Sequence, residues 1–255
     1  MDKWVNRRVN PQGTCSHRLF CFPWAGGGTL FYAAWTKLLP GNIEVNAIRL
    51  PGRESRFKDP LYSNLDLLIE ELCRILLPSL QEKPFSFFGH SMGAIVCFEL
   101  ACYLKKHHNL EPVHMFLSGA TAPYSTLRQE KVTDKPLDQL TDDEFLERLG
   151  KLGGTPKEVL ANKSLIRLFI PVIRADLILL EKYSKEAPSD PPLSCPMNFF
   201  DGAEDRTRNH DIDNWKTISS GSFDVQLLPG EHFYLQQEEN TAKIIQTIAE
   251  KLKSS

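Results

Sequence analysis

The sequence has no excess of charge of either sign. Its 30 Lys and Arg residues nearly balance 32 Asp and Glu residues, which leaves a formal net charge of −2 at pH 7. A protein that holds a polyanion needs a basic surface, so this balance argues against nucleic acid as a partner. The hydrophobic fraction of 42% and the charged fraction of 24% are close to globular averages, which excludes a wholly disordered, collagen-like or coiled-coil chain.

The six cysteines lack the spacing of a disulfide framework or of a zinc site. No C-x-x-C pair occurs, and most of the cysteines lie within apolar stretches. We therefore expect buried free thiols in a reducing compartment, with no metal ion and no cofactor. The first eight residues also lack the apolar run of a secretory signal, which favours a cytosolic protein.

Long hydrophobic runs are scarce as well. Only residues 85–104 approach the ~20 apolar residues that a transmembrane helix requires. His90 and Glu99 lie within this stretch, and Gly89 and Gly93 break its middle. Ionisable side chains are costly in a bilayer, so we interpret the stretch as a strand followed by a helix and expect no stable membrane insertion.

Short β-branched or aromatic runs alternate with helical patterns along most of the chain. The predicted strands cover residues 17–24, 43–50, 85–88, 113–117, 196–200 and 223–228. The helical patterns between and after them cover residues 65–77, 94–106 and 241–252. This alternation predicts an α/β fold with a mostly parallel sheet, helices on both faces and a ligand site beyond the carboxyl ends of the strands. We expect a single domain over residues 1–255.

The alternation fails at residues 122–192, which contain two helical patterns, at 134–150 and 164–183, and no strand. In the second pattern Arg167, Arg174 and Glu181 recur every seven residues as a narrow polar stripe. Its apolar face is therefore wider than a one-sided surface helix needs. We expect a helical insertion within the domain, with neighbours on both flanks of its second helix.

The most specific local pattern is a G-x-S-x-G at residues 89–93, directly between a predicted strand and a predicted helix. In a nucleophile elbow the serine takes a strained conformation in a sharp turn, and the residues two before and two after it must be small. Gly89 and Gly93 meet this demand, so Ser91 is the candidate nucleophile. A chance match would leave the flanking strand and helix unexplained.

A serine nucleophile needs a base within hydrogen-bond reach, and the base needs a carboxylate that orients it. In a fold with this elbow the chain order is serine, acid, histidine. Of the seven histidines only His210 and His232 come late enough. His232 follows the last predicted strand and a Pro-Gly turn, whereas His210 lies in a polar stretch typical of a solvated loop. We therefore favour His232 as the base.

Three carboxylates follow the strand predicted at 196–200, namely Asp201, Glu204 and Asp205. Gly202 permits a tight turn at this point. A residue beyond that turn is better placed to point back over the sheet than one still in the strand. We favour Asp205 as the orienting acid, with Asp201 as its competitor and Glu204 third.

Acyl chemistry also needs N–H donors for the oxyanion, normally from the residue after the nucleophile and from a loop after an earlier strand. Met92 is the first candidate donor. The glycine-rich loop at 22–28 is the source of the second, with Ala25 favoured and Trp24 as the alternative. This loop does not match a dinucleotide-binding pattern, because Phe31 stands where G-x-G-x-x-G requires glycine.

Five motifs, in order along nearly the whole chain, resemble those of the type II thioesterase family of α/β hydrolases. They are F-P-x-A-G-G at 22–27, L-P-G-R-E-x-R at 50–56, F-F-G-H-S-M-G at 87–93, G-x-x-D at 202–205 and L-P-G-x-H-F at 228–233. Within the family, C-F-P-W at 21–24 and G-G-T-P-K at 153–157 are similar to the medium-chain thioesterases of vertebrate fatty acid synthase.

The resemblance implies an α/β-hydrolase fold and the hydrolysis of fatty acyl thioesters on the phosphopantetheine of the acyl carrier protein domain of fatty acid synthase. The family's triad carries over onto Ser91, Asp205 and His232. The polar residues 206–210 depart from the family, in which an apolar residue usually follows the acid. A carboxylesterase, a lipase or an acyltransferase would use the same triad, and a non-enzymatic scaffold would need no triad at all.

The helical insertion matches what such a fold uses as a lid over an acyl chain. Its candidate acyl-binding residues are Leu168, Val172, Ile173 and Leu177. The alternative is a helix pair docked on the sheet with no pocket. For the L-P-G-R-E motif we favour a structural ion pair between neighbours 53 and 54 over direct contact with phosphopantetheine.

Overall fold

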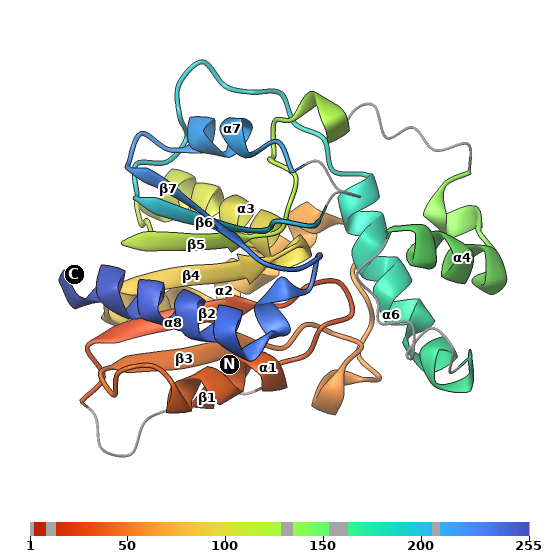
Figure 1. Ribbon diagram of the computed structural model, residues 1–255, viewed down its shortest axis with the longest axis horizontal. Helices are drawn as coiled ribbons and strands as arrows, with labels where there is room; N and C mark the ends of the chain where they lie inside the picture. The colour runs from red at the N-terminus through yellow and green to blue at the C-terminus, as the bar shows by residue number, and fades with distance from the viewer. Residues whose placement is uncertain (1–2, 9–13, 129–134, 153–162, 206–209, 255) are drawn as a thin grey trace.

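The computed structural model describes residues 3–8, 14–128, 135–152, 163–205 and 210–254 (Figure 1). A seven-stranded sheet forms its centre, in the order β1-β3-β2-β4-β5-β6-β7. The strands β2 to β7 run parallel, and β1 pairs antiparallel with β3 at one edge. The strand bounds are β1 (Val5–Arg8), β2 (His17–Phe22), β3 (Ile43–Ile48), β4 (Phe85–His90), β5 (His114–Ser118), β6 (Met197–Gly202) and β7 (Phe223–Leu228).

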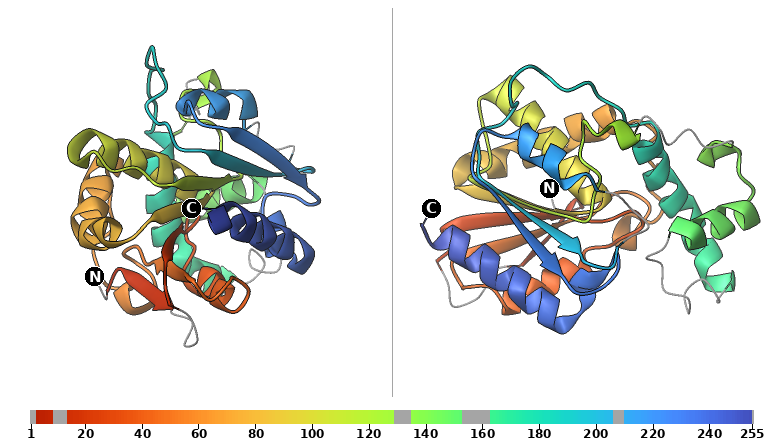
Figure 2. Two further views of the ribbon diagram at one scale, coloured as in Figure 1. Left: turned by 90° about the vertical axis from the view of Figure 1, so that its left-hand side faces the viewer. Right: turned by 45° about the horizontal axis from the view of Figure 1, so that its top comes forward.

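Helices cover both faces of the sheet (Figure 2). One face holds α2 (Leu65–Glu82), α3 (Met92–His108) and α7 (Ile212–Trp215), and the other holds α1 (Leu30–Ala33) and α8 (Glu238–Lys251). The 3-10 helices are η1 (Ala34–Lys37), η2 (Glu54–Arg56), η3 (Thr126–Arg128), η4 (Leu137–Gln139), η5 (Lys216–Ile218), η6 (Tyr234–Gln236) and η7 (Leu252–Ser254). The predicted α/β class, with a mostly parallel sheet, is confirmed.

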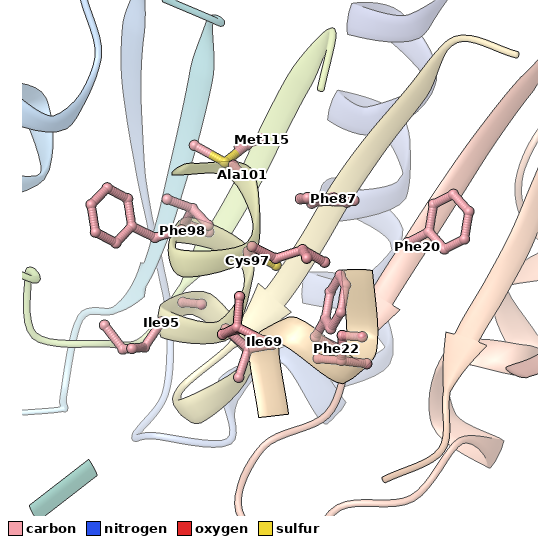
Figure 3. Packing of buried hydrophobic residues seen from close by; sticks show 14 of the residues in the cluster. Phe20, Phe22, Ile69, Phe87, Ile95, Cys97, Phe98, Ala101 and Met115 are labelled. Carbon is pink, nitrogen blue, oxygen red and sulfur yellow. The ribbon is translucent and has the colours of Figure 1, made fainter. Parts of the chain in front are cut away.

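The larger core lies between the sheet and the helices α2 and α3. Figure 3 shows Phe22 and Phe87 of the sheet beside Ile69 of α2 and Cys97 of α3, all of them buried. Every residue of the strands β2 to β6 is buried, as expected for strands covered on both faces. Burial on both faces explains why these strands appear in the sequence as short apolar runs.

Two further helices, α4 (Asp142–Leu152) and α6 (Lys163–Glu181), lie between β5 and β6 in the chain. They sit beyond the carboxyl ends of the parallel strands (Figures 1 and 2). The two helices share a small hydrophobic cluster of their own, which includes Phe145, Leu149 and Ile170. Neighbours on both flanks thus cover α6, because its opposite side reaches the main core through Leu179.

The first inserted helix is shorter than its predicted range of 134–150. It begins at Asp142, after the 3-10 helix η4, because a capping box forms at Thr141. The Thr141 hydroxyl accepts from the Glu144 N–H at 3.3 Å, and the Glu144 carboxylate accepts from the Thr141 N–H at 2.6 Å. Residue 134 and the G-G-T-P-K motif at 153–157 lie outside the described residues.

All six cysteines are free thiols, and four of them are buried, in agreement with the sequence analysis. Among the helices that the structure describes, none is both long and apolar enough to cross a bilayer.

Candidate active site

Ser91 occupies a sharp turn between the end of β4 and the start of α3. Its backbone has φ +56° and ψ −116°, a conformation that a residue with a side chain rarely adopts. Its N–H donates to the Ser118 carbonyl at 2.8 Å, which ties the turn to β5. The predicted nucleophile elbow therefore has both the strain and the strand-to-helix context that the pattern requires.

The two glycines of the motif are required by close backbone contacts. A Cβ atom at Gly89 would lie 2.2 Å from the Gly93 carbonyl oxygen. A Cβ atom at Gly93 would lie 2.2 Å from the carbonyl oxygen of Phe22, at the end of β2. Any larger residue at either position would push α3 away from the sheet and displace Ser91.

His232 lies in the loop after β7, next to the serine turn. Its ring centroid is 4.8 Å from that of His90, the residue before Ser91. Its Nδ1 atom lies 2.7 Å from Asp205 Oδ2, and both side chains are almost fully buried. A carboxylate at Nδ1 is the arrangement that orients a catalytic imidazole so that its Nε2 atom can act as the base.

The turn after β6 brings Asp205 to the histidine. The Asp205 N–H donates to the Gly202 carbonyl at 3.1 Å, and Ala203 and Glu204 donate to carbonyls in and after β7. A Cβ atom at Gly202 would lie 2.6 Å from the Gly230 carbonyl oxygen, so glycine is needed where the two loops cross. Asp205 therefore lies beyond the turn, where the sequence analysis placed the orienting acid.

Asp201 is bonded to a different histidine. Both of its carboxylate oxygens lie 2.8 Å from His210 Nδ1. The expectation that His210 lies in a solvated loop is wrong, because the residue is only 3% exposed. Its Nε2 atom lies 3.6 Å from Asp205 Oδ2. The polar residues before His210 gave no signal of this burial, and residues 206–209 lie outside the described part of the chain.

Asp205, His210 and His232 are the one group in the described ranges whose ligand atoms gather closely enough to hold a metal ion. Two ligands of tetrahedral zinc, each about 2.0 Å from the metal, lie roughly 3.3 Å apart. The 2.7 Å between His232 Nδ1 and Asp205 Oδ2 is shorter and has the length of a hydrogen bond. The geometry therefore fits a proton between these two atoms better than a metal ion.

A buried hydrogen-bond network supports the turn from behind. Ser118 Oγ lies 2.8 Å from His90 Nδ1 and 2.5 Å from the Tyr234 hydroxyl. Burial raises the pKa of Tyr234 well above its usual value, so its hydroxyl stays protonated and can donate. These contacts fix the residue before Ser91 and the segment just after His232 relative to each other.

The candidate oxyanion donors come from the first residue of α3 and from the loop after β2. Met92 is the first residue of α3, where the helix leaves its N–H groups without carbonyl partners in the helix. Ala25 lies in a tight turn in which the Gly27 N–H donates to the Trp24 carbonyl at 2.8 Å. The C=O and N–H of one peptide point in opposite directions. The Ala25 N–H therefore points out of this turn, as a candidate oxyanion donor must.

A family model described as the thioesterase domain matches residues 17–252. The chain belongs to the thioesterase family. The medium-chain S-acyl fatty acid synthase thioesterase of Rattus norvegicus is 40% identical to it over 238 residues, which cover 93% of this chain and 89% of the relative. The predicted membership of this hydrolase family is therefore confirmed.

Two solved structures carry the same fold. The thioesterase RedJ from the prodiginine pathway of Streptomyces coelicolor superposes with a TM-score of 0.81 at 29% identity, covering 96% of this chain and 90% of RedJ. The type II thioesterase BorB from the borrelidin biosynthetic cluster gives a TM-score of 0.81 at 29% identity, covering 98% of each chain. This thioesterase therefore has the α/β-hydrolase fold that the sequence predicts.

The ion pair expected between Arg53 and Glu54 does not form in this thioesterase. Arg53 instead pairs with Asp176 of α6. Glu54 pairs with Arg49 at 2.7 Å and accepts hydrogen bonds from the N–H and hydroxyl of Thr29. The expected pair is therefore wrong, and the two side chains instead join the motif to α6 and to the loop after β2.

The four candidate acyl-binding residues of α6 have different environments. Leu168 is 60% exposed, and Val172 is buried. Ile173 and Leu177 are half-buried and pack on the cluster shared with α4. The helix also presses on the loops of this thioesterase that follow β2 and β3, since Cβ atoms at Gly26 and Gly52 would meet its side chains.

Proposed function

We propose that this thioesterase hydrolyses fatty acyl thioesters carried on the phosphopantetheine of an acyl carrier protein in the cytosol, and so releases medium-chain fatty acids from fatty acid synthase. The observation that carries the chemistry is the buried Asp205–His232 contact beside the strained turn of Ser91. The substrate class is supported by the rat relative, whose name assigns it to fatty acid synthase.

In the proposed first half-reaction the Ser91 hydroxyl attacks the thioester carbonyl carbon while His232 Nε2 takes its proton. Asp205 stabilises the imidazolium that forms. The N–H groups of Met92 and Ala25 donate to the oxyanion of the tetrahedral intermediate. Collapse of this intermediate breaks the C–S bond, and His232 gives the proton to the departing pantetheine sulfur, which leaves as the thiol.

The second half-reaction restores the enzyme. Water attacks the acyl-serine carbonyl, His232 takes a proton from that water, and the same two N–H groups hold the second oxyanion. Collapse releases the free fatty acid and returns the proton to Ser91. Both halves need only water and the side chains and backbone N–H groups of the chain, so the proposal calls for no cofactor or metal.

The main alternative is an oxygen-ester hydrolase or an acyltransferase, because the acyl-enzyme is the same in all three. Acyl carrier protein thioesters and matched oxygen esters of the same chain length separate these functions. We expect a higher kcat/KM for the thioester and release of free acid. A higher kcat/KM for the oxygen ester, or transfer of the acyl group to an added alcohol in place of hydrolysis, would contradict the proposal.

We further propose that residues 122–192 act as a lid whose helix α6 covers the acyl chain. Burial of one methylene group contributes about 0.8 kcal/mol, so a sheathed acyl chain gains several kcal/mol over one left in water. Leu168 and its neighbour Phe169 are both exposed, so α6 presents adjacent apolar side chains that a bound acyl chain would cover. The candidate lining consists of Leu168, Val172, Ile173 and Leu177.

Polar substitution on this face is expected to act selectively on long substrates. Leu168→Gln and Leu177→Gln should each lower kcat/KM by about 15-fold for a long acyl thioester, since losing roughly two buried methylenes costs about 1.6 kcal/mol. An acetyl thioester should be hydrolysed almost as fast as by the unmodified enzyme. The measurement is kcat/KM over a series of acyl chain lengths, with the melting temperature recorded for each variant.

Leu67→Gln is the matched control, because Leu67 lies on α2 and is 57% exposed, close to the exposure of Leu168. It should change kcat/KM at no chain length. Equal losses at all chain lengths, or losses that follow a lower melting temperature, would make α6 an ordinary part of the core.

A further inference from the structure

Helix α6 carries a buried carboxylate on the side that faces the strand ends. Asp176 is 6% exposed, and its Oδ2 atom accepts from the Gly26 N–H at 2.8 Å. The Arg53 guanidinium donates to the same oxygen. Burial raises the pKa of Asp176, and the Arg53 charge and the Gly26 N–H oppose this rise. One carboxylate thus joins α6 to the loops after β2 and β3.

This arrangement is poorly explained by stability alone. A buried ion pair often contributes no more to folding than apolar residues of similar volume, because both charges must leave water. The Arg53–Asp176 pair also leaves the Nε and Nη1 atoms of Arg53 without a partner in the described part of the chain. What the pair does supply is a fixed geometry among three segments that are distant in sequence.

The segment that Asp176 holds is the turn with the candidate oxyanion donor. Gly26 has φ +75°, so its conformation is one that only glycine adopts readily. Ile173, one turn before Asp176 on α6, packs directly on it, since a Cβ atom at Gly26 would lie 2.5 Å from Ile173 Cγ1. Among the described residues, the Asp176 carboxylate is the one side-chain acceptor bonded to the Ala25–Gly26 peptide, so its loss would remove the contact that orients this peptide.

We propose that Asp176 is a positioning residue for acyl transfer, which orients the Trp24–Gly27 turn so that the Ala25 N–H faces the oxyanion. The helix that covers the substrate then also completes the oxyanion hole. This inference rests on the proposed hydrolysis through Ser91. It adds Asp176 of α6 as a residue that positions one of the oxyanion donors. Arg53 contributes by keeping the Asp176 carboxylate ionised and in place.

Replacement of Asp176 tests this role, because a misplaced oxyanion donor should lower kcat and leave substrate binding unchanged. Loss of one oxyanion donor typically lowers kcat by about 10²- to 10³-fold. We expect Asp176→Leu to lower kcat by about 10²-fold, with KM little changed and the same factor for acetyl and medium-chain thioesters. Asp176→Asn keeps an oxygen that can accept from Gly26, so its loss should be smaller.

The decisive readout is inhibitor affinity. A trifluoromethyl ketone adds to the serine and forms an oxyanion, whereas a thioether with a methylene in place of the carbonyl does not. Asp176→Leu should weaken binding of the ketone by about the factor lost in kcat and leave the affinity for the thioether unchanged. Equal weakening of both inhibitors, an unchanged kcat, or a loss seen only in KM for long chains would overturn the inference.

Two further variants separate positioning from folding. Arg53→Met combined with Asp176→Leu removes both charges, so it should restore the melting temperature and retain the loss in kcat. If both leucine variants unfold, Asp176→Ala, which also lacks an acceptor for the Gly26 N–H, decides, and ketone affinity equal to that of the unmodified enzyme overturns the role. Glu181→Gln is the control on the same helix, since Glu181 binds the Leu137 N–H and not the oxyanion loop.

The small ester p-nitrophenyl acetate keeps this test independent of the natural substrate. If the enzyme hydrolyses this ester but no carrier thioester, the proposed substrate is wrong while the role of Asp176 is still measured. If the Asp176 variants keep full activity on it while the unmodified enzyme hydrolyses carrier thioesters, only the positioning role fails.

Discussion

Replacement of Ser91 by alanine is expected to abolish turnover while leaving the fold intact. The change removes one hydroxyl group from a half-buried position and keeps the backbone N–H that donates to Ser118. In serine hydrolases the loss of the nucleophile lowers kcat by about 10⁶-fold, because what remains comes from binding and the oxyanion donors alone. The measurement is kcat on a medium-chain acyl thioester, with the melting temperature as the test of folding.

Covalent labelling identifies the nucleophile directly. A serine-directed phosphonate should add one adduct to the unmodified enzyme, and peptide mapping should place it on Ser91. Ser118→Ala is the control, because it removes a hydroxyl bonded to His90, next to Ser91, but keeps the carbonyl that accepts from the Ser91 N–H. It should still be labelled, whereas Ser91→Ala should not. An adduct on any other residue would contradict the assignment.

The central strands are predictable because a strand buried on both faces consists largely of apolar residues, and such a run is visible in the sequence. The edge strand β1 was missed, since it is four residues long and contains Asn6 and Arg7. Its position depends on partners more than 30 residues away, including Glu44, which pairs with Arg7 at 2.6 Å. A strand stabilised by such long-range contacts need not contain an apolar run or an alternation of apolar and polar residues, so the sequence carries no local sign of it.

The same distinction applies to the site. Ser91 and its two glycines form one contiguous motif, because the strain and the close contacts all arise within a single turn. The pairing of His210 with Asp201 was missed, since it depends on a loop path and not on a residue pattern. The Arg53–Asp176 pair spans 123 residues of sequence, and nothing near either residue predicts the other.

His232→Ala is expected to lower kcat about as much as Ser91→Ala, by about 10⁵- to 10⁶-fold, because the two groups act as one unit. Asp205→Asn should cost less, about 10⁴-fold, since an asparagine N–H directed at Nδ1 selects the wrong tautomer of the imidazole. The effect is direct, because His232 Nδ1 and Asp205 Oδ2 lie 2.7 Å apart, within hydrogen-bond distance. The measurement is the steady-state kcat of each variant on the same acyl thioester.

Asp201→Asn is the matched control, because it makes the same chemical change four residues earlier. Asp201 binds His210 Nδ1, and His210 approaches Asp205 only at 3.6 Å, so the change reaches the base indirectly. We expect kcat to fall by no more than about tenfold, as for a group that touches no reacting atom. A larger loss for Asp201→Asn than for Asp205→Asn would mean that the Asp201 carboxylate acts through His210 and that His232 is not the base. Double replacement of Asp205 and His232 completes the argument, since two members of one catalytic unit should together lose little more than His232→Ala alone.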